Sequence, residues 1–279
     1  MKVVLFCGGQ GTRIRDYSEA IPKPMVHIGY RPILWNIMKY YAHFGHKDFI
    51  LALGYKADKI KDYFVNYDET ISNDFVYSRG GKAIELLSSD IEDWRITFVD
   101  TGMHSNIGMR LMRVREHLKG EEVFLANYAD GLSDLQLPDM IGHFLAQPNK
   151  VGSFMTYQPT SSFHIVRMQE NGEVTDIAPI AQSNLWINTG YFIFRQEIFD
   201  YINYGEELVV EPFQRLIRDQ RLATYRHKGF WQAMDTFKDK MLLDDMQAAG
   251  DTPWEVWNTV TEPLSKPFYD PLTVQNGRR

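Results

Sequence analysis

Apolar runs and amphipathic segments alternate along the first half of the chain. Short apolar runs at residues 3–6 and 48–53 predict buried strands, and residues 34–41 carry apolar side chains at helical spacing. The same patterns continue as helix, strand, helix and strand at residues 57–64, 96–99, 111–118 and 122–126. A regular alternation of this kind is typical of a parallel sheet covered by helices on both faces. The pattern therefore predicts an α/β fold, doubly wound around a mostly parallel, Rossmann-like sheet.

The pattern changes after about residue 147. Strand-like segments at residues 151–157, 163–168, 173–177 and 187–194 are separated by turn residues, and the stretch around Asn171-Gly172 is typical of a hairpin tip. These segments predict a mixed extension of the sheet. No linker rich in Gly, Ser or Pro divides the chain, so we expect one domain. That domain would span residues 1–257, with residues 1–147 and 148–257 as two functional halves and 258–279 as a C-terminal tail.

Composition agrees with a water-soluble enzyme. With 279 residues, of which 44% are hydrophobic, the chain can bury a substantial core, and no apolar stretch approaches the length of a membrane span. The N-terminus has a charged Lys2 and then a strand, not a signal peptide, so we expect a cytoplasmic protein. The single cysteine, Cys7, excludes an intramolecular disulfide. A net charge of −6 argues against nucleic acid as the main partner.

A glycine-rich turn follows the first strand directly. Gly8, Gly9 and Gly11 lack Cβ atoms, so backbone N–H groups there can approach an anionic ligand closely. Arg13 adds a guanidinium fork and Lys23 a mobile point charge, which together suit a polyphosphate. The glycine spacing fits neither the dinucleotide-binding motif nor the nucleoside-triphosphatase loop. The segment therefore predicts a phosphate site of another kind.

Two aspartates are candidates for a metal site. Asp130 follows the strand predicted at residues 122–126, and open α/β sheets bind ligands beyond the carboxyl ends of their strands. Asp235 precedes a helix predicted to begin near Phe237. Together the two carboxylates would be able to hold one Mg²⁺. On spacing alone, Asp130 as a turn cap and Asp235 as the N-cap of the helix remain open alternatives.

The motif Gly9-Gln10-Gly11-Thr12-Arg13, followed by Lys23-Pro24-Met25, resembles the signature of the sugar-nucleotide pyrophosphorylases. These nucleotidyltransferases join a nucleoside triphosphate to a sugar 1-phosphate. Residues 99–102, 108–111 and 229–232 are similar to the cytidylyltransferase branch of this family. The resemblance covers residues 1 to about 257. It implies a Mg²⁺-dependent transfer from CTP to glucose 1-phosphate or a related sugar phosphate, with release of pyrophosphate.

The resemblance also implies roles for individual residues. Arg13 and Lys23 would be catalytic, and Asp130 and Asp235 would bind the metal, with Ala129 where the family usually has glycine. The nucleotide would be bound by residues of the glycine turn and of the cytidylyltransferase segments: Leu5, Gly8, Gly9, Gly11, Thr12, Thr101, Gly102 and Arg110. The expected partners are CTP, a phosphorylated small-molecule acceptor and further copies of the chain in a homo-oligomer, without nucleic acid or membrane.

The acceptor half departs from the family pattern. Asn188 and Gly190 match the acceptor loop, but Ala178 stands where the family usually has a lysine that holds the sugar phosphate. His164 follows Phe163 at a position that is usually glycine, and it is either a structural residue or an acceptor-binding cation. Two alternatives therefore stay open. One is a cytidylyltransferase for a phosphorylated acceptor other than glucose 1-phosphate, and the other is a non-catalytic paralogue that binds a sugar nucleotide.

Overall fold

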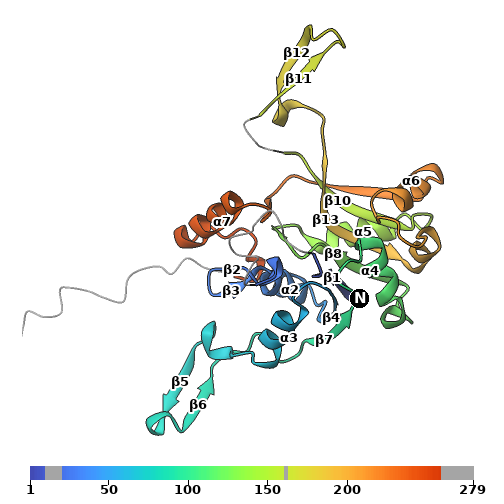
Figure 1. Cartoon of the computed structure of the whole chain (residues 1–279). Helices are drawn as coiled ribbons and strands as arrows, with labels where there is room; N and C mark the ends of the chain where they lie inside the picture. The colour runs from blue at the N-terminus through green and yellow to red at the C-terminus, as the bar shows by residue number, and fades with distance from the viewer. Residues whose placement is uncertain (10–20, 160–162, 259–279) are drawn as a thin grey trace, which may run out of the picture.

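A seven-stranded sheet forms the centre of the computed structural model, which describes residues 1–9, 21–159 and 163–258 (Figure 1). From one edge to the other the strands are β14 (Leu222–His227), β10 (Gly152–Tyr157), β13 (Ile187–Arg195), β8 (Val123–Asn127), β1 (Val3–Phe6), β4 (Asp48–Leu53) and β7 (Arg95–Asp100). Of these seven, β13 alone runs antiparallel to its neighbours. The mostly parallel sheet with a mixed extension is therefore confirmed.

Helices cover both faces of the sheet. Val3 and Leu5 point into one apolar cluster and Val4 and Phe6 into a second, because successive side chains of a strand face opposite ways. Four helices pack on the first cluster: α2 (Ile33–His43), α3 (Ala57–Val65), α5 (Leu137–Leu145) and α7 (Phe237–Ala249). The second cluster contains α4 (Ile107–Val114) and α6 (Glu211–Arg218). Burial on both faces explains why strands such as β1 read as continuous apolar runs.

Local capping sets the helix boundaries. The helix predicted at 111–118 begins earlier, because the Asn106 side chain accepts a hydrogen bond of 2.9 Å from the Met109 N–H. It continues as the 3₁₀ turn η5 (Arg115–Leu118). A capping box between Thr236 and Asp239 starts α7. The helix predicted at residues 57–64 is observed as α3 (Ala57–Val65). The sequence pattern did not predict the helices α5 and α6.

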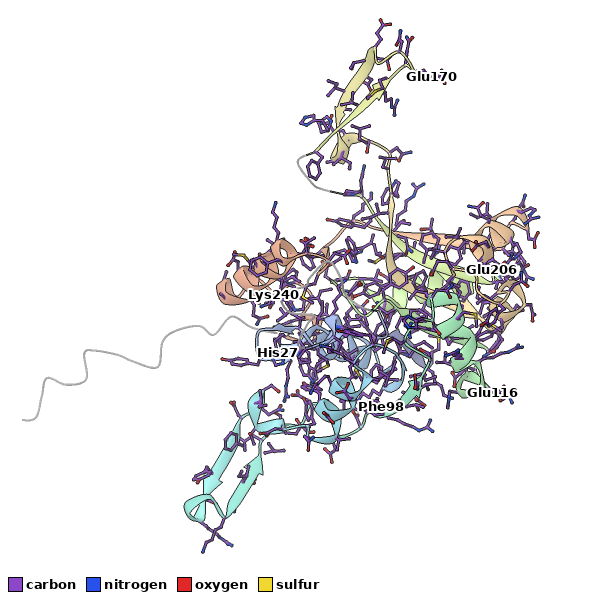
Figure 2. All side chains as sticks on the ribbon, viewed as in Figure 1. His27, Phe98, Glu116, Glu170, Glu206 and Lys240 are labelled. Atoms are coloured by element: carbon purple, nitrogen blue, oxygen red, sulfur yellow. The ribbon has the colours of Figure 1, made fainter. Side chains whose placement is uncertain are left out.

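Two hairpins stand out from the sheet (Figure 1). One is β5 (Phe75–Ser78) with β6 (Ala83–Leu86), and the other is β11 (His164–Met168) with β12 (Val174–Pro179). Figure 2 shows Glu170 at the outer end of the second hairpin, where the tip was predicted.

Shorter elements complete the described chain. Two small strand pairs are β2 (His27–Ile28) with β3 (Arg31–Pro32), and β9 (Gly131–Ser133) with β15 (Trp231–Ala233). The remaining 3₁₀ turns are η2 (Lys23–Met25), η3 (Glu69–Ile71), η4 (Arg79–Gly81), η6 (Ile180–Gln182), η7 (Gln196–Tyr201) and η8 (Val256–Asn258). Among the helices that are described, none is both long and apolar enough to cross a membrane.

Candidate functional site

Predicted site residues meet at one edge of the sheet. Because β8, β1, β4 and β7 are parallel neighbours, their carboxyl ends lie at the same edge. A cavity of about 230 Å³ opens at the ends of β1 and β8. Its walls combine apolar and charged side chains with a glycine backbone: Phe6, Gly9, Lys23, Pro24, Ile107, Tyr128 and Asp130.

Lys23 lies between the two predicted metal ligands. Its Nζ donates hydrogen bonds of 2.7 Å to Asp130 Oδ2 and 2.6 Å to Asp235 Oδ1, and its side chain is only 13% exposed. Burial disfavours the ammonium, but the two carboxylates outweigh that effect and raise the pKa of Lys23. Lys23 is therefore a charged ammonium at neutral pH, held between two carboxylates.

Backbone pairing brings the two aspartates together. The Met234 N–H donates a hydrogen bond of 2.8 Å to the Asp130 carbonyl, next to the pairing of β9 with β15. Thr236 is the N-cap of α7, so the alternative role of Asp235 as that cap is wrong. The Asp235 N–H instead donates to Asp239 Oδ2 at 3.1 Å. The capping box of α7 thus fixes the backbone on which Asp235 stands.

The carboxylates of Asp130 and Asp235 fit the requirements of a divalent cation. Both already converge on one ammonium group, and Mg²⁺ in phosphate-transferring sites is held by one or two carboxylates plus phosphate oxygens. Within the described part of the chain, no group of three or more His, Cys, Asp or Glu side chains could hold a metal.

Ala129 adopts the left-handed backbone conformation, with φ of 62°. Alanine disfavours this region, whereas glycine tolerates it. The Asn127 side chain offsets the cost by accepting a hydrogen bond of 2.7 Å from the Ala129 N–H. The turn that presents Asp130 can thus form without the usual glycine.

The glycine turn is described through Gly9, while Gly11, Thr12 and Arg13 lie outside the described residues. Leu5 is fully buried in β1, with its side chain in the apolar core. The Gly8 carbonyl accepts hydrogen bonds from the Tyr55 N–H at 3.3 Å and from Arg110 Nη2 at 2.8 Å.

Arg110 is a buried cation beneath this turn, with only 2% of the residue exposed. Its other acceptors are the carbonyls of Leu53, Gly102 and Met103 and the hydroxyl of Thr101. Within the described residues Arg110 makes no ion pair with a carboxylate, and burial lowers its pKa. Four neutral carbonyls and one hydroxyl therefore solvate the guanidinium.

Thr101 and Gly102 lie on the loop after β7. The Thr101 hydroxyl donates to the Leu53 carbonyl at 2.6 Å and accepts from Arg110 at 2.7 Å, and Thr101 is fully buried. The hydroxyl is thus engaged within the protein in this structure. Gly102 has φ of 82°, and its N–H donates to Asp100 Oδ1 at 2.9 Å.

Tyr128 connects the acceptor loop to the cavity. Asn188 donates to the Tyr128 hydroxyl at 3.3 Å and accepts from the Gly190 N–H at 3.0 Å, while the Tyr128 N–H donates to the Gly190 carbonyl at 3.1 Å. The structure therefore brings Asn188 and Gly190 to the edge that holds Asp130. Tyr128 was not among the predicted site residues, although an aromatic residue directly after a predicted strand and two positions before Asp130 is a usable signal.

His164 and Ala178 lie apart from this group. Both belong to the β11–β12 hairpin, which extends away from the sheet (Figure 1). His164 is exposed, and among the described residues no hydrogen bond or ion pair links it to Asn188 or Gly190. The structure does not bring His164 to the rest of the predicted acceptor site.

Known proteins similar to this chain were found by sequence and by structure. The model of the Nucleotidyl transferase family matches residues 2–247. Glucose-1-phosphate cytidylyltransferase of Salmonella typhi is 38% identical over 259 residues, which cover 92% of this chain and 100% of that protein. The probable glucose-1-phosphate cytidylyltransferase of Bacillus subtilis is 35% identical over the same shares. A solved UDP-glucose pyrophosphorylase complexed with UDP-glucose superposes with a TM-score of 0.65 at 16% identity, over 89% of this chain and 98% of that one, which supports the fold.

Proposed function

Because the chain belongs to the nucleotidyl transferase family, we propose that it transfers a cytidylyl group from CTP to glucose 1-phosphate or a related sugar phosphate. The observation that carries this proposal is the placement of Lys23 between Asp130 and Asp235 at the carboxyl edge of the sheet. A charged group flanked by candidate metal ligands, beside a glycine turn, suits a polyphosphate. The full-length similarity to relatives that carry the cytidylyltransferase name supports CTP as the nucleotide.

The reaction needs little covalent chemistry from the protein. A phosphate oxygen of the acceptor attacks the α-phosphorus of CTP, the bond from that phosphorus to the bridging oxygen breaks, and pyrophosphate leaves. The attacking phosphate is already ionised at neutral pH, so no general base is required. Catalysis then consists of positioning and charge stabilisation.

We assign the charge-stabilising roles to this chain's own residues. Lys23 would contact the transferring phosphate, since its ammonium lies at the cavity wall and is held by Asp130 and Asp235. The N–H groups of the glycine turn and Arg13 would hold the remaining phosphates. Asp130 and Asp235 would bind Mg²⁺, which when bound neutralises charge between the entering and leaving oxygens.

We place the two substrates on opposite sides of Asp130. The nucleotide would lie over Gly8 and Gly9 and towards the loop of Thr101 and Gly102, because these residues follow β1 and β7, which both lie on the same side of β8 in the sheet. The acceptor would lie towards Asn188, Gly190 and Tyr128. His164 can take part in acceptor binding only if the β11–β12 hairpin folds towards this loop.

A pyrophosphate-release assay tests the proposal. Each of CTP, UTP, dTTP, ATP and GTP is combined with glucose 1-phosphate, mannose 1-phosphate, glucosamine 1-phosphate and a non-sugar phosphate such as glycerol 3-phosphate. We expect release with CTP and a sugar 1-phosphate, and a clear preference for CTP, because each unpaired base-edge hydrogen bond costs about 1 to 3 kcal/mol. Binding of CTP without turnover on any acceptor would favour the non-catalytic paralogue, and release with glycerol 3-phosphate alone would favour the other acceptor class.

We also propose that the chain is a homo-oligomer. The β5–β6 hairpin exposes several apolar side chains, among them Tyr77 at 64% and Ile84 at 54%, and exposed apolar patches often mark protein contacts. Light scattering on the full chain should give a multiple of 32.5 kDa, whereas a monomer mass would contradict this part of the proposal.

A further inference from the structure

The turn that carries Asp130 depends on one strained residue. β8 ends at residue 127 and β9 begins at residue 131, so the turn between them consists of residues 128–130. Ala129 has φ of 62°, a conformation that costs an alanine more than a glycine. Because φ and ψ are the only soft dihedrals of the backbone, those of one residue set the direction of the next. The conformation of Ala129 therefore decides where the Asp130 carboxylate points.

The Asn127 side chain holds Ala129 in this conformation. Its Oδ1 accepts a hydrogen bond of 2.7 Å from the Ala129 N–H, and its Nδ2 donates to the Tyr41 hydroxyl at 3.2 Å. Asn127 is 1% exposed, and in the sheet it pairs with Leu5 on one side and Tyr191 on the other. Both polar ends of the amide are therefore engaged, on a strand that is itself paired on both sides.

Two buried tyrosines support the turn. Tyr41 comes from α2 and contacts the Asn127 amide, whereas Tyr191 comes from β13 and donates to the Gly131 carbonyl at 2.9 Å. Their rings stack on each other, with centroids 6.1 Å apart and an angle of 28° between the planes. The residues on either side of the turn are thus fixed, and Ala129 is the position at which the turn could still change.

We propose that Asn127 is a positioning residue that sets the direction of Asp130 as a metal ligand. Without the Asn127 side chain, Ala129 would leave the left-handed region and would carry the Asp130 carboxylate away from Asp235. This inference rests on the proposed function, because it assumes that a divalent cation binds at the two aspartates. It makes the metal affinity of this chain depend on a buried residue that faces its own backbone. A glycine at position 129 would make Asn127 dispensable.

Calorimetric titration of Mn²⁺ into the full chain tests the proposal, with CTP at one fixed concentration and no acceptor. Asn127→Ala should raise the Kd for Mn²⁺ by about 10-fold or more, the usual loss when a residue that supports a metal ligand is removed. Ala129→Gly alone should leave the Kd within about 2-fold of wild type, because residue 129 keeps its hydrogen bond to Asn127 and glycine tolerates the conformation.

The double variant Asn127→Ala/Ala129→Gly is the central measurement. Glycine adopts the left-handed region without the strain, so the Kd for Mn²⁺ should return to within about 3-fold of wild type. Ala129→Gly would then tighten Mn²⁺ binding only where Asn127 is absent, as expected of two coupled residues. A merely structural role of Asn127 would not be rescued by glycine at position 129. A double variant that binds Mn²⁺ as weakly as Asn127→Ala would therefore overturn the proposal.

Pyrophosphate release gives a second readout. In Asn127→Ala the Mg²⁺ concentration for half-maximal activity should rise by about the same factor as the Kd for Mn²⁺. The affinity for CTP in EDTA should stay within about 2-fold of wild type, because the hydrogen bonds of the Asn127 side chain go to Ala129 and Tyr41. An equal loss of CTP affinity in EDTA would indicate a general collapse of the site and would overturn the proposal.

Asn36→Ala is the matched control. Asn36 is 3% exposed, lies on α2 with Tyr41, and donates from its amide to the Pro32 carbonyl at 3.2 Å. Each of the two asparagine variants removes one buried amide, so both should lower the free energy of unfolding in urea. The Kd for Mn²⁺ should stay within about 2-fold of wild type in Asn36→Ala, since the Asp130 turn keeps its contacts. An equal rise of the Kd in both variants would assign the effect to a loosened fold and would overturn the proposal.

The measurements separate this inference from the proposed function. If Asn127→Ala does not fold, the double variant should still fold and bind Mn²⁺ with nearly wild-type affinity, and its failure to do so would overturn the inference. If the wild-type chain neither binds Mn²⁺ with CTP nor releases pyrophosphate with any substrate pair, the proposed function fails. If the wild type does both and Asn127→Ala binds Mn²⁺ equally tightly, only this inference fails.

Discussion

The ammonium of Lys23 lies 2.7 Å from a carboxylate oxygen of Asp130, a residue 107 positions away in sequence. Asp235 approaches the same ammonium from the start of α7 at 2.6 Å. Two carboxylates this close would repel each other without a cation between them. The lysine therefore stabilises the arrangement in which both carboxylates can also meet a divalent ion.

Lys23→Met should lower turnover by about 10²-fold or more, because it removes a preorganised charge aimed at the transferring phosphate. The measurement is kcat for pyrophosphate release at saturating substrates. Lys39→Met is the control, since Lys39 is also a partly buried lysine and pairs with Asp90 at 2.9 Å, outside the site. Near-normal kcat in Lys23→Met, or an equal fall in both variants, would remove Lys23 from the catalytic set.

Asp130→Asn and Asp235→Asn should each strongly lower metal-dependent turnover. Each replaces a charged ligand by a neutral amide, so the concentration of Mg²⁺ needed for half-maximal activity should rise steeply. Chelation with EDTA should stop the wild-type reaction, and added Mg²⁺ should restore it. Asp93→Asn serves as the control, because Asp93 is an exposed carboxylate paired with Lys47. Turnover that persists in EDTA would contradict the metal role of both aspartates.

Stability should rise with pH between about 4 and 6.5 through His46. Burial, followed by the positive charge of the N-terminus, lowers the pKa of His46 from 6.5 to about 4. In this pH window the unfolded chain binds a proton that the folded chain does not, so the free energy of unfolding increases as pH rises. His46→Gln should flatten this part of the curve, as measured by urea unfolding at several pH values. A slope identical to wild type would show that His46 does not contribute.

The central strands can be predicted from the sequence because burial on both faces makes them continuous apolar runs. The parallel direction of β1, β4 and β8 then follows from the βαβ order, and so does the position of Asp130 at the ligand edge. The start of α4 is harder to predict from the sequence. Gly108 lies in its first turn because a Cβ there would be 2.4 Å from the Glu206 carbonyl, and that contact depends on a segment far along the chain.

The hydrogen bonds of Arg110 could not be predicted from the spacing of residues in the sequence, because their acceptors come from three separate segments of the chain. The same holds for Tyr128, whose partners Asn188 and Gly190 reach it only after β13 pairs with β8. Sequence motifs identify which residues are unusual. The fold decides whether such a residue faces the ligand or holds the backbone that does.

Gly190→Ala should destabilise the acceptor loop more than Gly172→Ala destabilises its hairpin. Both glycines have φ above 80°, so both variants carry the strain of a left-handed alanine, about 1 to 2 kcal/mol. A Cβ on Gly190 would also lie 2.4 Å from the Tyr128 ring, whereas Gly172 has open space. Urea unfolding of both variants isolates the effect of the collision. Equal losses would show that Tyr128 moves aside at little cost.

Ala178→Lys should improve the use of glucose 1-phosphate. Ala178 cannot neutralise an acceptor phosphate, and a charge-assisted hydrogen bond contributes about 1.5 to 3 kcal/mol, so the KM for the acceptor should fall by about 10-fold or more when the cation is restored. This effect requires the β11–β12 hairpin to approach the loop of Asn188 and Gly190. Val166→Lys is the control: it places the same charge on the opposite strand, at the position that pairs with Ile177. A fall of KM in Ala178→Lys alone would show that the hairpin closes over the acceptor in the active enzyme. Unchanged KM in both variants, with efficient use of glucose 1-phosphate by the wild type, would show that the acceptor phosphate is held from the sheet edge without the hairpin.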